Sequence, residues 1–477
     1  MLRRSFLTGI TSATLGFCAQ GFARAQEPMS VRIDIDATAA PGPLIAQDFI
    51  GLSYESAILA DADYISPDNA SLIGLIRRFG RAGVLRIGGN TSEDTAWNPS
   101  DQDMVPGRIV LTPARIDRLA ALVRALGWKL IYGLNLARGT AQTAAAEAAY
   151  VARALGPYLL AFQIGNEPDG FGRWRSVRAK SYDAAAYLAE WRAFHQAIRA
   201  QVPDARFAGP DVAMETGWVG ALAATHPPAL VLLTQHYYAD GPAGAPQLSV
   251  SKLLQSAQQI VPVLDALARE GRTYGLPFRI VEANSIYNEG QPGVSDTLGA
   301  ALWGLELMFQ LAAAGAAGVN FHAGPHNLRP GVDKAYTPIA RAGGGRYRPA
   351  PLYYAMLLFT QFAPGATVLP LQMAGPRDVV ALAVRGSEGS VRIGLINKDL
   401  GRGVRASIDA GRDVAGASIL RLAGPDPHTT SDVTLGGAQV DTSGEWNPRA
   451  EHVPVADRAI ALDLPAASAA VLTLNVK

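Results

Sequence analysis

The sequence predicts an α/β fold, a (β/α)8 TIM barrel followed by a C-terminal antiparallel β-sandwich. Short apolar strand-like runs alternate with longer helical stretches over about 300 residues, and several of these runs end in polar clusters. Near Ala363 the helical pattern stops, and short alternating segments separated by Gly, Pro and Asp follow. Alternation of this kind is typical of strands in a sandwich.

The strand-like runs of the barrel are apolar throughout, which is typical of a parallel sheet covered by helices on both faces. They span residues 49–55, 84–90, 129–135, 159–167, 207–211, 230–238, 278–284 and 318–324. Between them, apolar residues recur three and four positions apart, which predicts helices over 113–127, 144–156, 185–200 and 297–315. Eight repeats favour a closed barrel. A doubly wound open sheet has the same periodicity and is the competing architecture.

The segment "VRIDIDA" at 31–37 alternates like a half-buried strand and lies outside the β/α pattern. We therefore expect four parts along the chain. They are an export signal (1–25), an N-terminal strand segment that joins the sandwich (26–47), the (β/α)8 barrel (48–362) and the sandwich (363–477).

The first residues predict export by the twin-arginine (Tat) route. Arg3 and Arg4 precede Ser-Phe-Leu and a moderately apolar stretch, and Ala23-Arg24-Ala25 forms an A-x-A cleavage site. A periplasmic or secreted location follows. Cleavage after Ala25 would remove Cys18, the single cysteine, so the core must be stable without disulfides.

Composition narrows the function classes. The chain is 49% hydrophobic and 17% charged with a net charge of +1, so no general field attracts nucleic acid or, after signal removal, an anionic membrane. The seven histidines are scattered, and the closest pair, His322 and His326, is interrupted by Gly-Pro, which argues against a metal site. A P-loop and a G-x-S-x-G motif are also missing from the sequence. We expect no cofactor.

Two glutamates are the candidate catalytic residues. Glu167 ends the fourth predicted strand (159–167) in "GNEP", and Glu282 ends the seventh (278–284) in "VEAN". The carboxyl ends of barrel strands form the active face, so the two carboxylates are expected to meet across its mouth. Two facing carboxylates are what glycoside hydrolysis requires. Either glutamate alone would be read as a solvated strand-end residue. Asn166, beside Glu167, offers an amide to a sugar hydroxyl.

The two motifs resemble the retaining glycoside hydrolases of clan A. More narrowly, several segments are similar to glycoside hydrolase family 79, which contains bacterial β-glucuronidases and heparanases. These segments are "LRIGGNTSEDTAW", "FQIGNEPDGF", "TQHYY", "GVNFHAG" and the long stretch from Glu282 to Met308. The resemblance implies that Glu167 is the acid/base and Glu282 the nucleophile of a double displacement.

The resemblance also implies roles for other residues at the mouth. Sugar hydroxyls would bind Glu55, Asn90 and Thr91, and the phenol of Tyr238, more than that of Tyr237, should hydrogen-bond Glu282. A substrate carboxylate would be held by tyrosine hydroxyls and loop amides, with Tyr287 and Tyr336 as candidates. Aromatic or loop packing is the alternative for each tyrosine. The nearby cations are interpreted as solvated surface: Arg329, Lys334, Arg341, Arg346 and Arg348.

The leading hypothesis is an exo-β-glucuronidase that releases glucuronic acid from the non-reducing end of a glycoside or oligosaccharide. An endo-β-glucuronidase acting on heparan- or hyaluronan-like chains is the closest rival, although the near-neutral charge argues mildly against sulfated polymers. A neutral-sugar glycosidase of the same clan and a non-catalytic carbohydrate-binding protein are the other readings. The sequence leaves the oligomeric state open.

Overall fold

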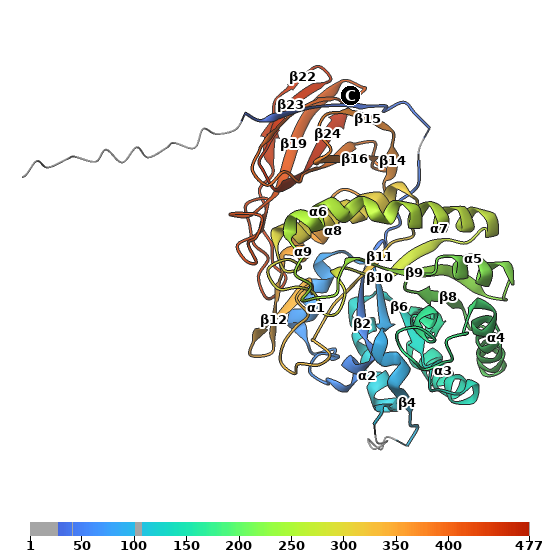
Figure 1. Cartoon of the computed structure of the whole chain (residues 1–477). Helices are drawn as coiled ribbons and strands as arrows, with labels where there is room; N and C mark the ends of the chain where they lie inside the picture. The colour runs from blue at the N-terminus through green and yellow to red at the C-terminus, as the bar shows by residue number, and fades with distance from the viewer. Residues whose placement is uncertain (1–26, 41, 101–106, 477) are drawn as a thin grey trace, which may run out of the picture.

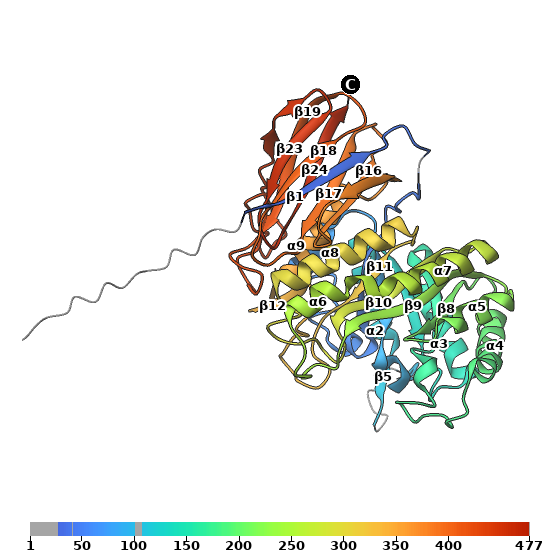
Figure 2. The same ribbon diagram turned by 45° about the horizontal axis from the view of Figure 1, so that its top comes forward.

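A computed structural model describes residues 27–40, 42–100 and 107–476 of the chain. The export signal expected over residues 1–25 lies outside this range. Figures 1 and 2 show two bodies, a barrel wrapped by helices and a β-sandwich packed against one side of it. None of the helices in the described part of the chain is long and apolar enough to cross a membrane.

Eight parallel strands close into a barrel, as the sequence predicts, and closure removes the open-sheet alternative. In chain order the strands are β2 (Ile50–Glu55), β3 (Val84–Gly88), β6 (Lys129–Leu134), β7 (Leu159–Ile164), β8 (Phe207–Val212), β9 (Leu230–Asp240), β10 (Phe278–Ile286) and β11 (Val319–His322). Because β11 pairs with β2, the last strand completes the ring beside the first. All carboxyl ends therefore face the same way.

Helices connect and cover the strands, and their apolar faces supply the outer core. They are α1 (Ala70–Arg78), α2 (Pro113–Leu126), α3 (Ala141–Leu155), α4 (Ala184–Gln201), α5 (Gly217–Ala224), α6 (Val250–Ser256), α7 (Val261–Tyr274), α8 (Leu298–Ala313) and α9 (Pro351–Thr360). Local signals set several boundaries: Asn69, Asp183 and Thr297 accept the backbone N–H of the first turn at their helices. Two small sheets decorate the barrel, β4 (Thr95–Trp97) with β5 (Ile109–Leu111) and β12 (Ile339–Gly343) with β13 (Arg346–Pro349).

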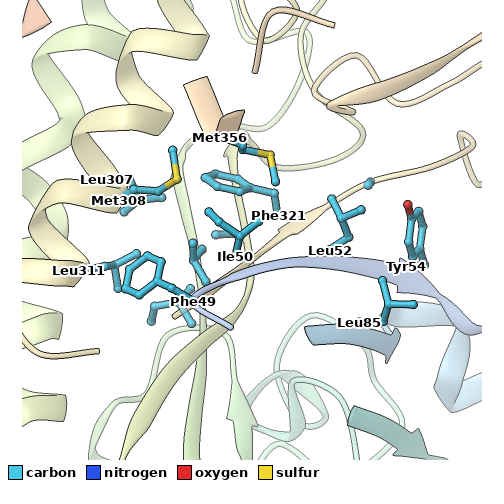
Figure 3. Packing of buried hydrophobic residues seen from close by; sticks show 14 of the residues in the cluster. Phe49, Ile50, Leu52, Tyr54, Leu85, Leu307, Met308, Leu311, Phe321 and Met356 are labelled. Atoms are coloured by element: carbon cyan, nitrogen blue, oxygen red, sulfur yellow. The ribbon is translucent and has the colours of Figure 1, made fainter. Parts of the chain in front are cut away.

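The core surrounds the strands and also fills the lower interior of the barrel. Figure 3 shows side chains of β2 and β11 packed against α8 and α9, where Phe49 and Phe321 lie among Met308, Leu311 and Met356. A separate apolar layer inside the barrel consists of Val84, Ile131, Ala161, Ala208, Leu232 and Val281. This layer closes the barrel below the polar residues of the site.

The sandwich consists of two sheets around their own core. One sheet has the order β15-β1-β18-β23-β22, and the other follows β14-β16-β17-β24-β19-β20 with β21 beside β19. The bounds are β1 (Met29–Ile35), β14 (Thr367–Leu369), β15 (Leu371–Ala374), β16 (Val379–Arg385), β17 (Val391–Asn397), β18 (Val404–Asp409), β19 (Val414–Ala423), β20 (Thr434–Leu435), β21 (Glu451–Val453), β22 (Val455–Ala456), β23 (Ala459–Leu464) and β24 (Ser468–Val476).

One pair in the sandwich departs from the antiparallel expectation. β1 runs parallel to β18 and antiparallel to β15. The reason is that β1 enters from the N-terminal side of the chain, before the barrel, and fills a position between two strands from the C-terminal part. No short hairpin joins it to either neighbour, so nothing forces an antiparallel pair there.

The two bodies share a buried contact. Lys398, just after β17, forms an ion pair of 2.8 Å with Glu306 of α8, and both side chains are buried. Gly394 of β17 lies so close to Phe309 and Phe362 that a Cβ would approach the Phe309 ring to 2.4 Å. The barrel and the sandwich are therefore packed directly against each other.

Candidate active site

The site lies at the carboxyl ends of the barrel strands and is built by alternation. Every second residue of a barrel strand points inward, so apolar residues in the lower layer are followed along the same strands by polar ones. On β3, Arg86 stands two positions after Val84, and on β9, His236 stands two after Thr234. The lower apolar layer is thus capped by a layer of buried polar side chains.

Arg86 is the centre of that polar layer. Its side chain is fully buried, and its guanidinium donates to Gln163 Oε1 (3.0 Å), Ser53 Oγ (3.0 Å) and Asn166 Oδ1 (2.7 Å). The same group forms ion pairs with Asp211 (2.6 Å) and Glu282 (2.5 Å). A buried cation is tolerated only when it is paired and its donors are used, and Arg86 meets both conditions.

Glu282 lies within β10, not at its end, because the strand continues to Ile286. The pairing of β10 with β9 shifts at this point, so that Ile280 and Glu282 oppose the consecutive residues Gln235 and His236. A bulge of this kind redirects a side chain and is common beside active sites. The prediction that Glu282 ends the strand is therefore wrong, and its side chain lies at a bulge inside β10.

The surroundings of Glu282 keep it ionised. Burial alone would raise its pKa, but His322, His236 and Arg86 outweigh burial and hold the pKa well below its ordinary value. Tyr238 donates its phenol to Oε1 at 2.9 Å, the hydrogen bond expected from the sequence. An ionised, oriented carboxylate of this kind is suited to act as a nucleophile.

Glu167 follows β7 in a left-handed backbone conformation, with φ 48° and ψ 53°. A non-glycine residue seldom adopts it, and the surroundings must hold it there. Its N–H donates to Asp211 O (2.9 Å), and its C=O accepts from Gly170 N (2.9 Å). Its carboxylate contacts His236 Nδ1 at 3.0 Å and Arg175 Nη2 at 3.5 Å.

The two glutamates meet, as the sequence reading requires. A carboxylate oxygen of Glu167 and one of Glu282 lie within 4.8 Å of each other and of a ring nitrogen of His236. Three such groups could also hold a metal ion. Here, hydrogen bonds occupy them: both nitrogens of His236 face carboxylates, and Glu282 contacts Arg86 and Tyr238.

A continuous network joins the two catalytic candidates. Asp211, at φ 67°, accepts from Arg86, from Gln163 (2.6 Å) and from His236 Nε2 (2.9 Å). Burial would lower the pKa of His236, but Asp211 and the glutamates raise it to about 10. His236 is therefore a cation that links Asp211 to Glu167.

Glu93 fixes the backbone of Asn166 through a hydrogen bond. This buried carboxylate accepts the backbone N–H groups of Asn166 (2.5 Å) and Ala137 (2.6 Å), so it joins the ends of β6 and β7. Asn166 Oδ1 is taken by Arg86, and Nδ2 has no hydrogen-bond partner among the described residues. The Nδ2 amide of Asn166 therefore stays a candidate donor to a sugar hydroxyl.

The three residues expected to bind sugar hydroxyls, Glu55, Asn90 and Thr91, differ in burial and in hydrogen bonding. Glu55 is buried, and its carboxylate accepts from Thr91 N (2.8 Å), Thr91 Oγ1 (2.6 Å) and Asn327 Nδ2 (3.0 Å). Burial would raise the pKa of Glu55, but His322 and Lys334 lower it to about 2. Thr91 thus holds Glu55 in place. Asn90 is exposed on the same turn.

The tyrosines differ in exposure. Tyr336 is buried, with its ring centroid 6.1 Å from that of Tyr238 and 6.2 Å from that of His322. Tyr287 is 42% exposed and lies over Gly241, where a Cβ would come within 2.4 Å of its ring. Tyr336 is therefore part of the wall of the site, and Tyr287 lies at its rim.

The surface reading of the basic loop is wrong for Lys334. Its side chain is buried, and Nζ forms an ion pair of 2.7 Å with Glu289 in the loop after β10. The loops after β10 and β11 fold onto each other, which encloses the lysine between them. Arg341 is partly exposed and pairs with Asp333 and Asp61.

Sequence reasoning missed Arg86, Asp211 and His236 as members of the site. A signal existed for Arg86, because a charged residue inside the apolar run "VLRIG" has no solvent to face. Asp211 and His236 depend on a bulge and on cross-barrel distances. No local pattern in the sequence reports these.

Comparison with known proteins finds two β-glucuronidases among the relatives of the chain. A β-glucuronidase from Neurospora crassa is 25% identical to the chain over 473 residues, covering 87% of this chain and 82% of the fungal protein. A β-glucuronidase from Aspergillus niger is 25% identical over 321 residues, 59% of each chain. No protein-family model matches the chain.

Among solved structures, a 4-O-α-L-rhamnosyl-β-D-glucuronidase from Fusarium oxysporum 12S, in complex with Rha-GlcA, superimposes with a TM-score of 0.79. Its identity is 18%, and the match covers 93% of this chain and all of that one. A GH51 arabinofuranosidase from Xanthomonas axonopodis pv. citri gives a TM-score of 0.69 at 16% identity, covering 94% of this chain and all of that one. The chain thus has the barrel-plus-sandwich fold of glycoside hydrolases.

Proposed function

We propose that this protein is a glycoside hydrolase of family 79 type that cleaves β-glucuronides with retention of configuration. The observation that carries the proposal is the distance between Glu167 and Glu282, whose nearest carboxylate oxygens lie within 4.8 Å. Retaining enzymes place their carboxyl groups about 5–5.5 Å apart, and inverting enzymes leave about 6.5–9.5 Å for a water molecule.

The geometry supports a double displacement. In the first step Glu282 attacks the anomeric carbon while Glu167 gives its proton to the glycosidic oxygen, so the bond to the leaving group breaks and a glycosyl ester forms on Glu282. In the second step Glu167 takes a proton from water, which attacks the same carbon and releases Glu282. Arg86 and Tyr238 hold Glu282 in the ionised form that attacks in the first step, and they stabilise the carboxylate that the second step releases.

A glucuronide is the substrate that the surroundings favour. The curated relatives that align along the chain are β-glucuronidases. In the site, the phenols of Tyr336 and Tyr287 and the buried cation Lys334 lie on the loops after β10 and β11. We assign the substrate carboxylate to the hydroxyls of the two tyrosines, because a hydrogen bond becomes stronger when its acceptor is charged. We assign sugar hydroxyls to Glu55 and Asn166.

Exo action is the primary form of the proposal. Asn327 donates to Glu55 and approaches Glu289 with its backbone N–H at 3.4 Å, so it forms a wall at the glycone end of the site. A cavity of about 270 Å³, lined in part by Glu55, Asn327 and Arg341, favours an endo-acting enzyme as the second candidate, since a further sugar would fit there. We also propose that residues 1–25 direct export.

The decisive assay compares p-nitrophenyl β-glucuronide, β-glucoside and β-xyloside in parallel, with Glu282→Gln as the inactive control. The expected result is turnover of the glucuronide alone. Comparable hydrolysis of the glucoside would replace the proposal with a neutral-sugar glycosidase. Saturable binding without hydrolysis of any substrate would indicate a carbohydrate-binding protein. Shortening of a glucuronate-containing polymer by internal cleavage would establish the endo form.

A further inference from the structure

A large aromatic side chain is exposed in the segment that follows Glu167 and takes no part in the chemistry described above. Trp174 is 48% exposed, and it lies in the segment between β7 and α4 that also contains Glu167. Tryptophan contributes a large part of the binding energy at many sites, so an exposed indole near a catalytic residue is a candidate ligand contact.

The segment holds the indole in a fixed position. Trp174 packs against Gly170, where a Cβ would come within 2.3 Å of the indole ring. The backbone N–H groups of Arg173, Trp174 and Arg175 all donate to Gly170 O, at 3.0–3.1 Å. One face of the indole is therefore packed against the glycine on a tight turn. A platform that is already rigid loses little entropy when a ligand stacks on it.

The two arginines that flank Trp174 differ in their contacts and in their exposure. Arg175 contacts the Glu167 carboxylate, and its side chain is largely buried at 14% exposure. Arg173 instead pairs with Glu215, and both of those side chains are partly exposed. A second exposed apolar residue, Met214, lies on the loop after β8, which Asp169 ties to this segment by accepting the Met214 N–H at 2.9 Å.

We propose that this segment forms the leaving-group subsite, and that it accepts a planar aromatic aglycone. The inference rests on the proposed function, because Glu167 must protonate the glycosidic oxygen and the aglycone must therefore leave past residues next to it. Trp174 stacks on the aromatic ring. Arg175 stabilises the negative charge that develops on the departing phenolic oxygen. The preferred substrates are thus aryl β-glucuronides.

The test measures kcat and KM for methyl and phenyl β-glucuronide with the full-length mature enzyme. The variants are Trp174→Ala, Trp174→Phe, Arg175→Gln and the matched control Arg173→Gln. Each variant is compared with the wild type on the same substrate, so the intrinsic reactivity of each leaving group cancels.

For Trp174→Ala we expect KM for the phenyl substrate to rise about 3- to 10-fold, the effect of one lost aromatic contact. KM for the methyl substrate should stay within about twofold, and Trp174→Phe should recover most of the loss. Arg175→Gln should lower kcat for the phenyl substrate more than for the methyl one. Arg173→Gln should leave kcat and KM unchanged for both substrates.

Equal losses on both substrates would overturn the inference, since they would assign Trp174 a purely structural role. An unchanged KM for the phenyl substrate in Trp174→Ala would overturn it too. Failure of the wild type to hydrolyse either glucuronide would instead refute the proposed function. The two outcomes can therefore be distinguished.

Discussion

At Glu282, burial and charge act on one carboxyl group in opposite directions. Burial in the barrel favours the neutral form, whereas His322, His236 and Arg86 favour the ionised form and dominate. The anion still needs an orientation, which a neutral donor provides without adding charge. Tyr238 is that donor, at 2.9 Å from Oε1. Single side chains thus determine whether the carboxylate can attack.

We predict that Tyr238→Phe lowers kcat for a glucuronide about 10- to 100-fold, because a hydrogen bond to a charged group contributes about 1.5–3 kcal/mol. The adjacent Tyr237→Phe is a matched control, since the Tyr237 phenol has no hydrogen-bond partner in the described part of the chain. Steady-state kinetics of both variants check this, with thermal unfolding to confirm the fold. Similar losses in the two variants would contradict the role of Tyr238.

At the scale of elements, α3 is attached to the barrel through a buried polar pair. Tyr132 of β6 donates to Glu147 of α3 at 2.8 Å. Burial raises the pKa of Glu147 to about 7. In the unfolded chain this carboxyl has its ordinary pKa of about 4.3. Between that pH and about 7, the unfolded state releases the proton and the folded state keeps it, so rising pH lowers the free energy of the unfolded state alone. The contribution of Glu147 to stability therefore falls as pH rises through this window.

Glu147→Gln keeps an acceptor for Tyr132 and removes the titration. We predict that the melting temperature of the variant, relative to the wild type, increases by a few degrees between pH 5 and pH 8. Calorimetry or fluorescence melting at the two pH values measures this difference, in which the other titrating groups cancel. A difference that stays constant with pH would show that Glu147 titrates normally.

The strands were predictable because their pattern is local. All eight barrel strands lie where the apolar runs place them, and Glu167 and Glu282 were identified from the polar residues that follow those runs. What the sequence could not show is geometry that depends on irregular backbone. The bulge at Glu282 and the left-handed residues Glu167 and Asp211 turn side chains toward each other. No periodicity encodes these turns.

At the scale of the whole molecule, the sandwich and the barrel are joined by a buried ion pair. Glu306 of α8 is fully buried, and Lys398 is the cation paired with it across the two bodies. Both residues look ordinary in the sequence, because their partners are distant along the chain. The partners of Arg86 are also distant along the chain, because they come from several different strands. Long-range pairing of this kind appears only in three dimensions.

Lys398→Met should destabilise the protein by about 3–5 kcal/mol, since it leaves a buried carboxylate without its cation. The double variant Glu306→Leu with Lys398→Met should recover a large part of that loss, because it removes both charges. Chemical denaturation followed by fluorescence compares the three proteins. If the single and double variants were equally destabilised, the cost would come from packing and not from charge.

The central claim is that Glu282 forms a covalent bond to the anomeric carbon while Glu167 serves both steps. The most direct measurement incubates the enzyme with a fluorinated glucuronyl fluoride, which forms the glycosyl ester quickly and hydrolyses it slowly, and locates the label by peptide mass spectrometry. The account predicts a single labelled peptide with the sugar on Glu282. A label on another residue, or rapid turnover of glucuronides by an enzyme that never becomes labelled, would contradict it.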